Sequence, residues 1–397
     1  MSINLTLIQK MYHSRTKDFW RFETSTWLFV FGISLISIFL PILLYKAGYT
    51  ISQILFFYLV FHFFNIPLNF LSEKLMRIFK TKRIIIFATF VNILFFFSIP
   101  FLEKHQSLYL LTLVAFLGAL FDAFYYTVAN YIFVGTNKKE ENLTKNISIL
   151  NFVWVSASIL APILGSFVLV YSNNKDVLFY IMIFFMLLSV IPLIKLEDIK
   201  LKREDKAKSI KKYFNSKINR ENTFFLAFYK ILATFEAVIF PVFLFIYFGN
   251  LKSVAIFAVL IPIFSIFSIF LASKLKRGIY IKTIYITTFL IGMMFFLRYF
   301  IQEDLIFYTT AVIVSALFIF MQSAVDSLFY GSAKENGSLT ISIYKNTISM
   351  TGRFVYFLIL YIYSLFFPQS IFDFAFLFTF LIAVLYFFYA YKIKQRC

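Results

Sequence analysis

Residues 121–167 read FDAFYYTVANYIFVGTNKKEENLTKNISILNFVWVSASILAPILGSF, and they predict two apolar helices joined by a polar turn. The first helix carries a single acid, Asp122. The second carries a stripe of small residues with a proline beside it: Ala157, Ala161, Pro162 and Gly165. In lipid, helices gain little from the hydrophobic effect when they associate, and small residues let their backbones approach closely. Because an acid at membrane depth is costly and rarely faces lipid, this stretch predicts close packing beside a buried charge.

The composition is that of an integral membrane protein. The 397 residues are 61% hydrophobic and 14% charged, and the mean hydropathy is +0.83. A soluble domain is about a quarter charged. The net charge of +19 would suit a nucleic-acid partner, but the basic residues lie in short loops between apolar runs. We therefore expect a lipid bilayer as the partner and no nucleic acid.

Twelve apolar runs are long enough to cross a bilayer, which takes about 20 residues per helix. They lie near residues 25–45, 51–70, 84–102, 108–134, 148–171, 177–194, 223–248, 254–272, 281–301, 305–330, 347–367 and 372–391. The sequence therefore predicts an all-α membrane protein with twelve transmembrane helices.

The loop charges predict the orientation of these helices. Loops on the side of the two termini hold 31 Lys and Arg residues, whereas the opposite side holds five. Cytoplasmic loops are rich in Lys and Arg, so both termini are expected in the cytoplasm. We expect a multi-pass protein of a prokaryotic plasma (inner) membrane.

The two halves of the chain resemble each other. Residues 70–77 align with 270–277, and residues 122–126 align with 326–330. The alignment predicts two six-helix bundles, residues 1–194 and 223–397, joined by a basic cytoplasmic linker over 195–222. Repeats in the same orientation imply a pseudo-two-fold axis along the membrane normal.

At this point the chain resembles the major facilitator superfamily of secondary transporters over nearly its whole length. Its version of the family's helix 2–3 motif is Asn69, Glu73, Lys74, Arg77, Lys80, Lys82 and Arg83. Its version of the helix-five antiporter motif is Ser148, Ala157, Ala161, Pro162, Gly165 and Ser166. The resemblance implies a monomer whose helices one, four, seven and ten line a central cavity. It also implies a gate in which Glu73, near Arg77, meets Arg353 at the start of helix eleven.

Five ionisable residues lie well inside the predicted spans: Asp122, Lys230, Glu236, Asp326 and Arg353. Lys230 and Glu236 are six positions apart, about 120° around a helix, so they cannot pair with each other. Asp122 and Asp326 are the candidate partners of Lys230. Our hypothesis is that Asp122 and Glu236 bind protons or a cationic group while Lys230 changes partner between states. The alternative is that both aspartates are structural.

Tyr126 and Trp154 have two possible roles each, and Arg298 has one expected role. Tyr126 and Trp154 could present rings to a substrate, or could simply pack. Arg298 lies near the outer end of helix nine, where we expect it to anchor the helix at the interface. The three histidines are far apart and the only cysteine is Cys397, so we expect no metal site. We also expect no cofactor, because the sequence has no Gly-rich nucleotide motif.

These observations predict a secondary active transporter that moves a small solute by alternating access, with efflux in exchange for protons (antiport) as the expected mode. The alternatives are proton symport for solute uptake, a membrane-embedded lipid-handling enzyme, and a sensor built on the transporter fold. The predicted outward loops are short, which disfavours the enzyme, and the buried charges disfavour the sensor. We therefore do not expect an enzyme.

Overall fold

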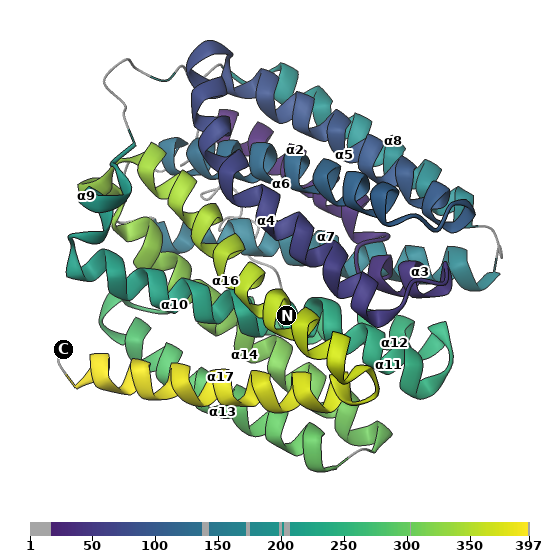
Figure 1. Cartoon of the computed structure of the whole chain (residues 1–397). Coiled ribbons are helices and arrows are strands. Elements are labelled where there is room, and N and C mark those ends of the chain that lie inside the picture. The colour runs from purple at the N-terminus through teal and green to yellow at the C-terminus, as the bar shows by residue number, and fades with distance from the viewer. Residues whose placement is uncertain are drawn as a thin grey trace, which may run out of the picture.

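The computed structural model describes residues 17–395 apart from 137–142, 172–174, 198–200, 202–206 and 302. Within these residues the chain is helical and has no strand. In Figure 1 the helices of the first half, in purple to teal, form the upper group, and those of the second half, in teal to yellow, form the lower group. The labels α4, α7 and α16 lie where the two groups meet.

The first half contains seven described helices. They are α2 (Lys17–Ser34), α3 (Leu40–Lys46), α4 (Ile51–Ile78), α5 (Thr81–Lys104), α6 (Leu108–Thr136), α7 (Leu143–Tyr171) and α8 (Lys175–Ile194). The cap of α4 shows how these helices begin. Thr50 accepts a hydrogen bond from the Gln53 backbone N–H, and the Gln53 side chain accepts one from the Thr50 N–H, so each satisfies a donor that the helix leaves free.

The second half contains its own set of long helices and several short helices. They are α9 (Ile210–Phe214), α10 (Lys217–Thr234), η2 (Phe235–Ile239), α11 (Phe240–Phe248), α12 (Leu251–Ala272), η3 (Arg277–Ile279), α13 (Tyr280–Phe300), α14 (Asp304–Gly331), α15 (Ala333–Asn336), α16 (Ser338–Phe366), η4 (Pro368–Ser370) and α17 (Ile371–Lys394). The predicted linker thus contains α9, and its last residues already belong to α10.

Each predicted transmembrane run coincides with helix. Nine described helices are long and apolar enough to cross a membrane. The other three runs correspond to the α2–α3 pair, which is interrupted, and to α7 and α12, parts of which lie outside the described side chains. Several helices extend beyond the predicted runs, and the largest difference is at α16, which begins at Ser338 rather than near 347. Its first two turns mix polar and apolar residues and are mostly buried, so an apolar run does not reveal them.

The two halves meet mainly where α16 packs on α4 and α6 and where α7 packs on α12 and α14. α4 packs on α16 along most of its length. Near one end the Ser52 hydroxyl donates to the Ser364 carbonyl oxygen over 3.2 Å, and towards the other end the Phe70 and Tyr344 ring centroids are 6.3 Å apart. On the other side, Asn151 of α7 donates to the Ser323 hydroxyl of α14 over 3.2 Å. These contacts enclose the space between the halves.

One helix in each half is interrupted just before a proline. Residues 35–39 form turns between α2 and α3 ahead of Pro41, and residues 235–239 form the π-helical turn η2 ahead of Pro241. Proline lacks the N–H that would continue the helical ladder, and π-turns within helices often occur at functional sites. The two interruptions are 200 residues apart, the same offset as between residues 70–77 and 270–277.

The small-residue stripe packs α7 against the first helix of its own half. Ala157 and Ala161 are fully buried. A Cβ atom added at Gly165 would lie 2.9 Å from the Leu35 carbonyl oxygen. The small residues therefore allow α7 to approach the interrupted part of the first predicted span.

Candidate functional site

A polar cavity of about 250 Å³ lies between the two halves. Five charged side chains line it: Asp122 from α6, Lys230 from α10, Asp326 from α14, and Lys345 and Arg353 from α16. Both halves thus supply charge to one space between them. At membrane depth a charged side chain costs about 2.5–3.5 kcal/mol even on the lenient insertion scale, so such a cluster calls for a function or strong pairing.

Asp122 is held by neutral amide groups. Its Oδ2 accepts hydrogen bonds from Asn65 Nδ2 at 2.8 Å and from Asn346 Nδ2 at 3.4 Å. Asn346 also donates to Asn69 Oδ1 at 2.6 Å, and Asn69 donates to Asn65 Oδ1 at 2.8 Å. This network joins α4 and α6 of the first half to α16 of the second.

Asp326 is held by a cation. Lys345 Nζ lies 2.9 Å from Asp326 Oδ1 and donates to the Tyr330 hydroxyl at 2.7 Å. The Tyr330 hydroxyl in turn donates to Asn130 Oδ1 at 2.7 Å. The partner of Asp326 is therefore Lys345 and not Lys230.

Lys230 and Arg353 line the same cavity without such partners. Neither side chain forms a hydrogen bond or an ion pair with another residue in the part of the chain that the structure describes. The Lys230 Nζ lies 4.9 Å from the centroid of the Tyr229 ring. The Arg353 Nε is buried and has no hydrogen-bond partner there. Two cations therefore retain unused hydrogen-bonding capacity in the cavity.

Glu236 is not part of this cavity, contrary to our expectation. It lies in η2 and forms an ion pair with Arg298 of α13. Arg298 is fully buried, donates to the Thr310 hydroxyl at 2.7 Å and lies over the Phe240 ring at 4.0 Å. The prediction that Arg298 anchors the helix at the interface was also wrong, because the buried carboxylate of Glu236 draws the guanidinium inward.

The expected contact between Glu73 and Arg353 is absent in this structure. Glu73 pairs with Arg77 at 2.7 Å, one turn along α4, and Arg353 lies in the cavity. Phe70 meets Tyr344 where α4 and α16 cross, and the two helices run in opposite directions. At 1.5 Å per residue, Glu73 and Arg353 are roughly 18 Å apart along the helix axes.

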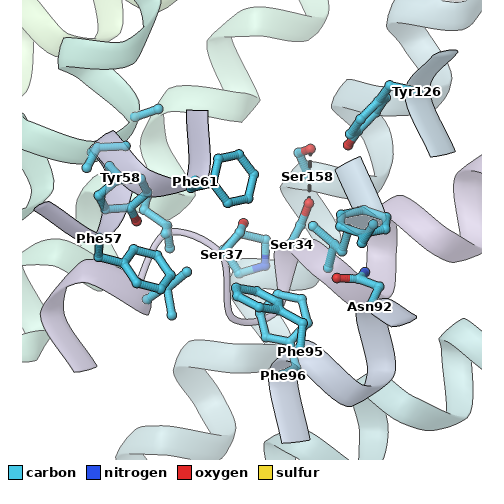
Figure 2. Close-up of a pocket in the computed structure, with 17 residues that line it drawn as sticks. Ser34, Ser37, Phe57, Tyr58, Phe61, Asn92, Phe95, Phe96, Tyr126 and Ser158 are labelled. Carbon is cyan, nitrogen blue, oxygen red and sulfur yellow. Dashed lines mark hydrogen bonds between the residues drawn. The ribbon is translucent and has the colours of Figure 1, made fainter. Parts of the chain in front are cut away.

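Tyr126 and Trp154 both line the polar cavity, and their ring centroids are 5.8 Å apart. Tyr126 also lines a second cavity of about 420 Å³, which is mainly apolar. Figure 2 shows Phe57, Phe61 and Phe95 around that space, with Tyr126 at one side. The second cavity reaches η2 through Ala237 and Val238. Tyr126 therefore lies where a polar and an apolar compartment adjoin.

The comparisons with known proteins agree with this architecture. A family model described as Major Facilitator Superfamily matches residues 23–356. The chain belongs to the major facilitator superfamily. It is accordingly a multi-pass membrane protein of a transporter family. Among curated proteins, no sequence matches this chain.

Two solved structures share the superfamily fold. The human organic anion transporter MFSD10 (TETRAN) gives a TM-score of 0.72 at 10% identity, with 94% of this chain and 98% of that chain covered. A bacterial homologue of the iron transporter ferroportin, in an outward-facing state, gives 0.70 at 14% identity, with 96% and 100% covered. At these identities the likeness shows the fold alone.

Within the superfamily fold, the sequence reasoning missed Lys345 and the asparagine network. Lys345 falls in the predicted cytoplasmic loop between the apolar runs 305–330 and 347–367. A clue was available in its spacing. Lys345 and Ser349 are four positions apart, as are Ser349 and Arg353, so all three share one face of a helix, and all three line the cavity.

Proposed function

We propose that this protein is a secondary transporter that moves a small solute by alternating access and links that movement to protons at Asp122. We further propose that it works as a monomer in a prokaryotic plasma membrane, with both termini in the cytoplasm. The observation that supports the proposal is the charged cavity between the halves, because rocking of two bundles around a central site exposes that site to each side in turn.

Asp122 is the proposed proton site because of its partners. Amide donors stabilise a carboxylate less than a cation does, so protonation of Asp122 disrupts less than protonation of Asp326. Both donors to Asp122 are asparagine amides, which can still donate to the carbonyl oxygen of a protonated acid, although more weakly than to the carboxylate. The charged groups that face it across the cavity are Lys230 and Arg353, with the Asp326–Lys345 pair beyond.

Two modes of proton coupling remain open to this site. Proton-coupled efflux, an exchange of solute for protons, is the mode that the helix-five resemblance implies. Symport is the second candidate, and one observation favours it: the cavity holds three cations and two acids. If the solute engages the cations, Asp122 loses their attraction and gains a proton, so proton and solute bind together.

Alternating access can be tested without knowing the solute. We would place one thiol in the cavity as Ser349→Cys, with Cys397→Ser to remove the natural thiol. We would then label membranes with an impermeant maleimide from either side. The proposal predicts labelling from both sides. Cross-linking Ser52→Cys to Ser364→Cys at one end of α4 and α16 should stop labelling from that side only.

A thiol at position 349 that reacts from one side alone, with or without the cross-link, would contradict alternating access. The enzyme and sensor readings would then regain support. The same cysteine pair treated with a monofunctional reagent is the control, because it modifies both positions without joining them.

A further inference from the structure

We propose that the solute is an organic anion, with its acidic group at Lys230 and Arg353 and its apolar body beside Tyr126. This inference names the solute of the transporter proposed above and rests on that proposal. It comes from the unequal pairing of charges in the polar cavity and from the apolar cavity beside it.

The two cations form a ready anion site. Lys345 is already neutralised by Asp326 at 2.9 Å, whereas Lys230 and Arg353 have no ion pair with any described residue. The buried Arg353 Nε has no hydrogen-bond partner in the same part of the chain, and leaving such a donor unsatisfied is costly. A guanidinium presents a planar fork that matches a carboxylate or a phosphate group.

A cationic solute fits the cavity less well. The acid that is free of a bonded cation, Asp122, already accepts from two asparagines, and two cations face it. A metal ion as cargo also lacks a ligand cluster, because the described residues contain no group of three His, Cys, Asp or Glu side chains that could hold one. Charge therefore favours an anion.

The aromatic side chains provide the second half of the argument. Trp154 and Tyr126 line the polar cavity beside the charges, and Tyr126 continues into the apolar cavity. In Figure 2 the rings of Phe57, Phe61 and Phe95 surround that space. A small inorganic anion would leave these rings without a role. An anion with an aromatic or branched apolar body would use both compartments.

The test is a series of naphthalene ligands that carry an anionic, neutral or cationic group, with one anion that lacks the ring. We would measure thermal stabilisation of the purified full-length protein by naphthalene-2-carboxylate, naphthyl phosphate, 2-naphthalenemethanol and 2-naphthylmethylamine, with acetate as the anion that lacks a ring. A ligand that binds the folded state raises its apparent stability. We expect an anion with a ring to bind at least tenfold more tightly than the alcohol, the amine and acetate.

Variants assign the effect to the site. Lys230→Gln and Arg353→Gln should each weaken anion binding by about tenfold or more, the scale of one charged hydrogen bond. Lys230→Arg, which keeps the charge, should retain binding. The controls are Lys282→Gln and Arg220→Gln, which remove the same charges from exposed positions and should leave binding unchanged.

The outcomes separate this inference from the proposed function. If neither anion binds more tightly than the alcohol, or if the amine binds best, the solute is not an organic anion, although alternating labelling of Ser349→Cys would keep the transporter. If anions bind but the two glutamine variants behave like the controls, the site is wrong. If the labelling does not alternate, the transporter proposal fails whatever binds.

Discussion

Asp122 and Asp326 are aligned with each other when the sequences of the two halves are compared, yet their surroundings in the structure differ. Asp122 accepts from the amides of Asn65 and Asn346. Asp326 pairs with the ammonium group of Lys345, which also bonds to Tyr330. One acid is held by neutral donors and the other by a cation. The two acids therefore share a position in the alignment of the halves but not the chemistry of their partners.

The difference suggests a division of labour between the halves. A carboxylate paired with a buried cation cannot take up a proton without leaving that cation unpaired. A carboxylate held by amides can, because its donors do not depend on its charge. We therefore assign proton binding to Asp122 and a structural role to Asp326. The predictions below test this contrast through the free energy of unfolding, from the largest effect to the smallest.

Lys345→Met should have the largest effect on stability. It leaves Asp326 buried without its cation, which typically costs about 3–5 kcal/mol. Chemical denaturation of the purified protein in detergent would measure the loss. Adding Asp326→Leu to the same chain should recover much of it, because the uncompensated charge is then removed. A single variant as stable as the natural chain would show that the pair is not structural.

Asn346→Leu should have an intermediate effect. The change removes one hydrogen-bond donor to Asp122 and one to Asn69. Asp122 still accepts from Asn65 Nδ2, and Asn69 still accepts from the Thr127 hydroxyl at 2.7 Å. We expect a loss of about 1–2 kcal/mol. Thr351→Val on the exposed side of α16 is the matched control. A loss as large as that of Lys345→Met would mean that Asp122 depends on this network as strongly as Asp326 depends on its cation.

The sequence was sufficient to predict the fold because transmembrane helices can be recognised from neighbouring residues alone. Length and hydropathy mark each transmembrane run, and the aligned segments relate runs of the first half to runs of the second. The partners of the buried charges were not predictable in this way. Glu236 lies in the π-helical turn η2 and pairs with Arg298 of α13, neither of which the apolar pattern reveals. Lys345 looked like a loop residue until the polar start of α16 was seen to be helical.

The predicted site residues divide along the same line. Asp122, Lys230, Asp326, Tyr126, Trp154 and Arg353 all line the polar cavity. Glu236 and Glu73 do not line it. Glu236 forms an ion pair with Arg298, and Glu73 forms one with Arg77. Burial depth could be judged from position in a span, whereas the direction of a side chain around its helix could be judged only where a repeat or a spacing pattern fixed it.

Asp122→Asn should leave stability almost unchanged while removing proton coupling. The amide keeps a carbonyl oxygen for Asn65, so we expect a loss of about 1 kcal/mol or less. In the symport mode, anion binding to the natural protein should strengthen as pH falls, because a proton on Asp122 leaves the cations free. In the exchange mode it should weaken, and either dependence should vanish in the variant. Asp326→Asn is the comparison. Similar stability losses in the two variants would contradict the proposal that Asp122 binds protons while Asp326 is structural.

Glu73→Gln should have the smallest effect and bears on the gate. Its partner Arg77 lies one turn away on a partly exposed face of α4, and such helical pairs contribute about 0.3–0.5 kcal/mol. If Glu73 acts only within α4, labelling of Ser349→Cys should be unaltered in the variant. If Glu73 instead reaches Arg353 in another state, as the superfamily resemblance implied, the variant should shift the ratio of labelling between the two sides. That shift would make Glu73 a partner of Arg353 in another state. The buried Nε of Arg353 would then lack a hydrogen-bond partner only in the state described here.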